Sequence, residues 1–215
     1  MLKDKINGFL NEKKGEHLDQ VKESAIADTE ILSEILQGLK SKNEIFRYNC
    51  HKVIFQISKA HPQLLYSKWD YFFDLLESPN AYHRMSAINI ISYLTSADTG
   101  RKFDPVFDRY FQLLDDKSMI VARYLALSTG IIAKNKPYLV EKIIEKLLGI
   151  ENTHHKEERK DLIKHDIIQF FSLLFDQITE KEKILSFVEK QLNSSSPKTR
   201  KAAKVFLEQF AKMNK

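Results

Sequence analysis

The chain has 215 residues, of which 43% are hydrophobic and 29% are charged, as in a protein that folds around an apolar core. Only 6 Gly and 5 Pro occur, which excludes turn-rich β-sandwiches and doubly wound sheets and favours helices throughout. The net charge of +5 comes from the carboxyl end, because residues 181–215 hold nine Lys or Arg against three acids.

The single cysteine, Cys50, can form no internal disulfide, which suits a reducing compartment. The amino-terminal segment is charged and lacks the apolar stretch of a signal peptide. No apolar run approaches the ~20 residues that span a bilayer. We therefore expect a cytoplasmic monomer without a membrane segment and without a cofactor.

Amphipathic stretches follow one another in pairs along the chain. Residues 1–27 carry apolar positions typical of one or two capping helices, which would cover one end of a helical array. Five helix pairs are then predicted, at about residues 28–60, 62–98, 103–135, 137–177 and 180–213. Their first helices are expected at about 28–40, 64–77, 105–114, 138–149 and 180–192. Ser, Asn and Pro in the turns, as at 78–80 and 194–197, can end one helix and cap the next.

A shared register marks the second helix of each pair. A basic residue is followed three positions later by a small or apolar one, at Arg47/Cys50, Arg84/Ala87, Arg123/Ala126, Lys164/Ile167 and Arg200/Ala203. Successive basic residues are 37, 39, 41 and 36 positions apart. The positions three, six, seven and ten after each basic residue are mostly apolar, and these offsets trace one face of an α-helix. Self-similarity at this period predicts a repeat architecture.

The segment from Ser196 to Ala203, with Pro197 and Arg200, resembles the turn and second helix of HEAT repeats. The first two copies resemble it without the proline, and the third keeps only the Arg and the Ala. The fourth copy departs most, because it has Lys164, Ile167 and a polar insertion at 151–160. The resemblance covers residues 28–215. It implies an all-α fold, with a single domain over 1–215 that is a right-handed α-α superhelical solenoid of about five HEAT-like pairs and an N-terminal helical cap.

In that family an Asp at the turn commonly pairs with the Arg of a neighbouring repeat. Here the corresponding positions are Asn43, Asn80, Met119, Lys160 and Ser196. The Arg side chains are therefore expected to bond carbonyl groups of the turns. The alternative is that some of them are free to meet an external anion.

The second helices of HEAT-like arrays line a concave groove. Offsets one and five after the basic residue point away from the predicted buried face, and they give a polar row with interspersed large residues: Tyr48, Lys52, Met85, Asn89, Tyr124, Ser128, His165 and Gln169. Tyrosines in such surroundings are common binding anchors. We predict a non-enzymatic scaffold that presents this groove to a macromolecular partner, in the first place another protein. The alternative for each large residue is packing against the next helix.

The basic carboxyl end suggests an alternative function in nucleic-acid binding. Phosphate contacts need Lys or Arg clustered on one face. In the last helix Lys198, Lys201 and Lys212 could share a face, with Lys204 near it. The same lysines suit the exposed end of a solenoid, where positive charge also complements the helix dipole.

No Gly-rich phosphate loop, nucleophile elbow or zinc-type Cys spacing occurs, so neither catalytic residues nor a metal site are predicted. His154 and His155, with acids at 157 and 158, form the one group with metal-ligand chemistry. Adjacent histidines are poorly placed to share an ion from a helix, and we expect a solvated loop.

A second alternative function comes from a weak resemblance to the DNA alkylation-repair glycosylases. Those enzymes have a similar chain length and use an Asp near a Trp to hold a damaged nucleotide. Here Asp74 follows Trp69 by five residues, whereas that family places its Asp four residues after the Trp, and no second Trp is present.

Overall fold

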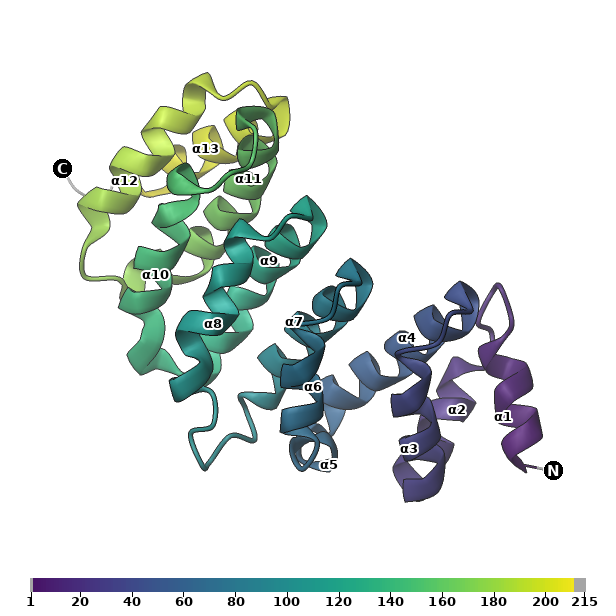
Figure 1. Ribbon diagram of the computed structural model, residues 1–215. Helices are drawn as coiled ribbons and strands as arrows, with labels where there is room; N and C mark the ends of the chain where they lie inside the picture. Colours follow the sequence, from purple (N-terminus) through teal and green to yellow (C-terminus); the bar gives the residue numbers. More distant parts are fainter. Residues whose placement is uncertain (1, 211–215) are drawn as a thin grey trace. The chain divides into compact units, whose positions relative to one another are not determined.

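The computed structural model describes residues 2–210 and shows an all-α protein (Figure 1). Thirteen α-helices and six 3-10 helices make up this described range, in which there is no strand. The chain divides into two compact units, Met1–Thr99 and Gly100–Lys215, and each is described by itself. The single domain expected over residues 1–215 stays a prediction. Within residues 2–210, no helix combines the length and the apolar character that crossing a membrane requires.

The first unit is built around one long helix, α4 (Glu44–Ala60). α4 packs against α2 (Leu18–Ala27), α3 (Thr29–Gly38) and α7 (Ala81–Leu94). α1 (Leu2–Leu10) packs on α2, and α6 (Trp69–Leu75) packs on α7 after the short α5 (Pro62–Tyr66).

Side-chain caps begin the second helices of this unit. The Oδ1 atom of Asn43 accepts the backbone N–H groups of Ile45 and Phe46, at 3.1 and 3.2 Å. Asn80 accepts the N–H of Tyr82 in the same way at the start of α7. These contacts satisfy N–H groups that a helix leaves free at its first turn, and they fix where α4 and α7 begin.

The second unit contains three long helices, and α11 packs against both α9 and α13. Shorter helices connect them. In chain order the elements are η1 (Asp104–Val106), α8 (Phe107–Phe111), η2 (Gln112–Asp115), α9 (Met119–Asn135), η3 (Pro137–Leu139), α10 (Val140–Leu148), η4 (Gly149–Asn152), α11 (Glu157–Leu174), η5 (Phe175–Gln177), α12 (Lys181–Lys190), η6 (Gln191–Asn193) and α13 (Pro197–Phe210).

The apolar face predicted for the second helices is confirmed. These helices are α4, α7, α9, α11 and α13, and four offsets in each give twenty positions. All are buried except Gly130, Leu174 and Leu207, which are half-buried. The register therefore identifies the core-facing side of each long helix.

The first helices are more broken than predicted. The segment expected as one helix at 64–77 is interrupted at Ser67 and Lys68, between α5 and α6. The segment expected at 105–114 is α8 with a 3-10 turn at each end. The periodic pattern does not show these interruptions, because side chains three apart stay on one side of the chain in both helix types.

The basic residue of the register closes its own turn in three of the five pairs. The Nη1 atoms of Arg47, Arg84 and Arg200 each donate to a serine carbonyl six residues earlier, at 2.9, 2.6 and 2.7 Å. The accepting carbonyls belong to Ser41, Ser78 and Ser194. The expectation that these arginines bond turn carbonyls is therefore confirmed.

The third and fourth pairs use the register cation differently. Arg123 of α9 donates from Nε and Nη2 to the two carboxylate oxygens of Asp166 on α11, at 2.6 and 3.1 Å. Lys164 of α11 lies 2.9 Å from the carboxylate of Glu151, in the turn before its helix. The Arg123–Asp166 contact therefore links the second helices of two successive pairs.

Cys50 lies where α3 crosses α4, and its sulfur is so close to Gly38 that a Cβ atom there would overlap it. The side chain is fully buried, and burial raises the pKa of its thiol to about 12. A thiol with so high a pKa is unreactive at neutral pH. The single tryptophan, Trp69, is also buried in this first unit.

Replacing Arg123 by Ala should destabilise the protein by about 3 kcal/mol, because it leaves the Asp166 carboxylate, which is only 2% exposed, without its partner. Urea unfolding followed by circular dichroism measures this change. As a matched control, Asp108→Ala removes the solvent-exposed pair with Lys146 and should cost less than about 1 kcal/mol. Equal costs for the two variants would contradict the structural role assigned to Arg123.

Candidate functional site

The predicted groove row is only partly exposed. Tyr48 and Gln169 are exposed, and three members are half-buried: Lys52, Tyr124 and His165. The other three members, Met85, Asn89 and Ser128, are buried, which corrects the expectation that they face away from the core. A second helix that packs beside another, as α7 does beside α4, is covered on its flank as well as on its inner face.

Two members of the row, Tyr48 and Met85, do lie together in the first unit. They line a hollow of about 350 Å³ between the amino-terminal halves of α4 and α7. We call this hollow the α4–α7 groove. Its lining residues are Glu44, Ile45, Arg47, Tyr48, His51, Tyr82, Met85 and Ser86.

Two exposed tyrosine rings mark the groove, and each ring carries a cation. Tyr48 and Tyr82 are 56% and 55% exposed. The guanidinium carbon of Arg47 lies 5.6 Å from the ring centre of Tyr82, and Nζ of Lys52 lies 4.5 Å from that of Tyr48. Such contacts favour one position of an otherwise exposed ring. Because Arg47 also bonds the Ser41 carbonyl, the Tyr82 ring is tied to the turn before α4.

A neutral histidine lines the groove beside these rings. The Nδ1 atom of His51 is buried and has no hydrogen-bond partner within residues 2–210, and its ring stacks on Phe55. Burial lowers the pKa of His51 to about 4. A second histidine, His83, follows Tyr82 in α7. Burial, and then the charges of Arg47 and Lys40, lower its pKa as well. The groove therefore combines uncharged rings and a thioether with the charged side chains of Arg47 and Glu44, and Lys52 lies over the Tyr48 ring.

Sequence reasoning did not select Tyr82 or His51. Tyr82 lies two residues before the register arginine of α7, in the first turn of the helix, and the stripe of offsets one and five does not reach it. His51 lies at offset four of α4, beside the predicted buried face. An aromatic residue two positions after the Asn cap of a second helix is the signal present for Tyr82.

The lysines at the carboxyl end are exposed, as expected. Lys198, Lys201 and Lys204 all lie on the surface of α13. Lys204 is 3.8 Å from Glu208, and the neighbouring Arg200 donates to the Ser194 carbonyl in the turn before α13. Lys212 lies outside the described residues. The described part of α13 therefore offers three lysines to a phosphate backbone.

The two residues of the glycosylase alternative differ in their surroundings. Trp69 is buried, and its ring meets the edge of Tyr66 at 6.0 Å. Asp74 is exposed on α6. Trp69 is thus used in packing.

No protein-family model and no curated protein matches this chain. The likeness to HEAT repeats thus depends on the register and the turns of the chain itself.

Stability should fall as the pH is lowered from about 6.5 to 4. Unfolded His51 binds a proton near pH 6.5, whereas burial holds its folded pKa at about 4. The unfolded state therefore binds more protons inside this window, and the unfolding free energy drops by up to about 1.4 kcal/mol per pH unit for this group. Denaturant unfolding at several pH values measures the slope.

The variant His51→Phe keeps a ring against Phe55 and should have a shallower slope between pH 4 and 6.5. The variant Phe55→Leu changes the same packing without removing a titrating group, so its slope should match that of the parent. An identical slope for His51→Phe and the parent would show that His51 does not cause the loss of stability at low pH.

Duplex DNA should bind weakly, with a slope of log affinity against log salt near −3, because three lysines of α13 at about 0.9 each supply the contacts. Fluorescence anisotropy at several salt concentrations measures it. Replacing Lys198, Lys201 and Lys204 together by Gln should abolish the binding. A slope beyond about −5 that survives this replacement would indicate a wider basic surface and would favour the nucleic-acid function.

Proposed function

We propose that the chain is a HEAT-like right-handed α-α solenoid of five helix pairs, and that it acts as a non-enzymatic scaffold for a protein partner. The α4–α7 groove is the proposed contact site. The repeated register, the common buried face of the second helices and the turn bond made by three arginines support the architecture. The observation that carries the function is the pair of exposed, cation-held tyrosines at one groove.

The energetics of the groove favour binding of a peptide segment. Tyrosine, tryptophan and arginine dominate the residues whose loss costs most at protein interfaces. Here Tyr48, Tyr82 and Arg47 line one hollow together with the apolar Met85 and Ile45. Rings that are held by cations before binding lose less conformational freedom when they are covered, which increases affinity.

The chemistry of the lining indicates which segment would fit. The hollow of about 350 Å³ holds one large side chain rather than a folded domain, and its lining is mainly aromatic and apolar. Arg47 and Lys52 add two positive charges next to the rings, against the single acid of the lining, Glu44. We therefore propose a partner segment that places an apolar or aromatic side chain in the groove and an acidic residue beside it.

The state of His51 supports a binding role over a catalytic one at this groove. Nucleophilic catalysis needs a hydroxyl or thiol hydrogen-bonded to a base, and a third group that orients the base. His51 Nδ1 makes no hydrogen bond to any described residue. Its low pKa also leaves it a poor base at neutral pH.

Selection of random peptides displayed on phage against the full chain tests this proposal. Enriched peptides should combine an aromatic or apolar residue with a neighbouring Asp or Glu. Their affinity, measured by fluorescence polarisation, should fall at least about tenfold in Tyr48→Ala and in Tyr82→Ala, because truncating an interface anchor costs more than about 1.4 kcal/mol.

The matched control is Tyr138→Ala in the second unit. Tyr138 is also exposed and also carries a cation, since Arg101 lies 4.7 Å from its ring centre. Its replacement should leave peptide affinity unchanged. Peptides that bind all three variants as tightly as the parent, or a selection that enriches nothing, would show that the α4–α7 groove is not the contact site.

A further inference from the structure

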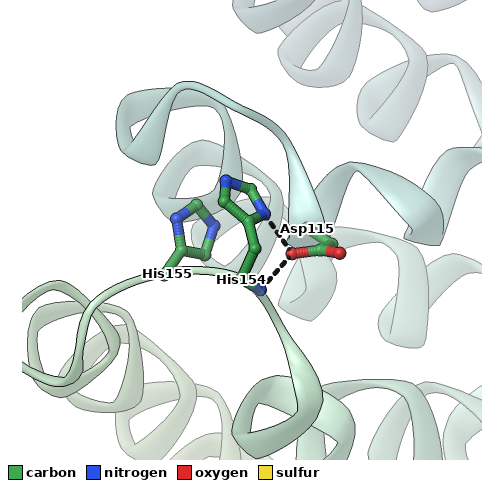
Figure 2. A group of neighbouring side chains, drawn as sticks. All are labelled: Asp115, His154 and His155. Carbon is green, nitrogen blue, oxygen red and sulfur yellow. Dashed lines mark hydrogen bonds and ion pairs between the residues drawn. The ribbon is translucent and has the colours of Figure 1, made fainter.

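Two loops of the second unit bring an aspartate and two histidines together. Asp115 ends η2, in the turn before α9, and His154 and His155 lie in the bend between η4 and α11. Figure 2 shows the His154 ring turned toward Asp115, with the His155 ring beside it. Residues 39 and 40 positions apart thus meet where the turns of the third and fourth pairs come together.

The contacts within this group are short. One carboxylate oxygen of Asp115 accepts from the backbone N–H of His154 at 2.7 Å and lies 2.5 Å from the Nδ1 atom of its ring. The two imidazole rings are 4.5 Å apart between centres. One ligand atom from each of the three side chains lies within 4.8 Å of the other two.

The loop explains how adjacent histidines serve one site. The sequence predicts a solvated loop here, because adjacent histidines are poorly placed to share an ion from a helix, and the backbone at His154 and His155 does bend instead of forming a helix. His155 is buried, and its Nε2 atom donates to the Leu114 carbonyl at 3.1 Å, which fixes the ring beside Asp115. Asp115 and His154 remain about half exposed, which leaves a way in from solvent.

The side chains of this group suit a cation. Asp115 offers a carboxylate oxygen, and His154 and His155 each offer a ring nitrogen. A carboxylate and neutral imidazoles are the forms in which these side chains coordinate metals.

We propose that Asp115, His154 and His155 form a binding site for a divalent transition-metal ion, with zinc as the best match. Zinc takes imidazole nitrogen and carboxylate oxygen at about 2.0–2.2 Å, and sites with three protein ligands complete the tetrahedron with water. The ion takes the place of the proton that His154 and Asp115 share. It joins the same two helix pairs as Arg123 and Asp166, and it therefore stabilises the packing of one pair on the next.

Isothermal titration of the untagged full chain with zinc chloride tests the site. One ion should bind per chain, and the melting temperature should rise by about 5 °C or more at a hundredfold excess over the dissociation constant. Asp115→Ala and His154→Ala should each weaken zinc binding more than tenfold. The control His17→Ala removes a histidine that lies 2.8 Å from Glu12 and should leave the affinity unchanged.

Circular dichroism of each variant without metal establishes that it is folded, and Asp115→His, which restores a ligand, should bind zinc again. Absence of zinc binding by the parent would overturn the proposal. It would also be overturned if folded Asp115→Ala or His154→Ala bound zinc as tightly as the parent. In that case the three residues form only a hydrogen-bonded clip between two turns.

Discussion

The hydrogen bond from a register arginine to the carbonyl six residues before it is the constraint that closes the turn in three of the five helix pairs. It satisfies a carbonyl left free in the turn and ties α4, α7 and α13 to the turn that precedes each of them. In α4 the same guanidinium also lies over the Tyr82 ring of the next pair. Arg47 therefore has a structural role in its turn and also forms part of the proposed contact site.

The second unit uses its register cations between pairs as well as within them. Arg123 crosses to Asp166 of the next second helix, and the Asp115–His154 contact joins the turns of those two pairs. Both contacts bring together residues about forty positions apart, one repeat length. The fourth pair, whose turn departs most from the repeat pattern, is thus bonded to the third pair through both its turn and its second helix.

The buried face of every long helix could be predicted from sequence, because burial against a helix's own pair has the period of the helix itself. The exposed face could not. Met85, Asn89 and Ser128 lie at the same offsets from the register residue as Tyr48 or Lys52, but they are buried. The position of a residue around its own helix does not show which side of that helix a neighbouring helix covers. The contacts of Tyr82 with Arg47 and of Asp115 with His154 join the turn regions of different pairs. A local sequence pattern does not predict which of these regions lie close together.

The two natural probes of the protein, Cys50 and Trp69, both lie buried in residues 1–99. Because the sequence has one cysteine and one tryptophan, the second unit contains neither. Thiol labelling and tryptophan fluorescence therefore report the opening of the first unit alone, while helical circular dichroism sums over both. The unfolding transitions seen by these signals can therefore be compared without any engineered label. Coincident transitions would show that the two units unfold together, and separate transitions would show that they unfold one after the other.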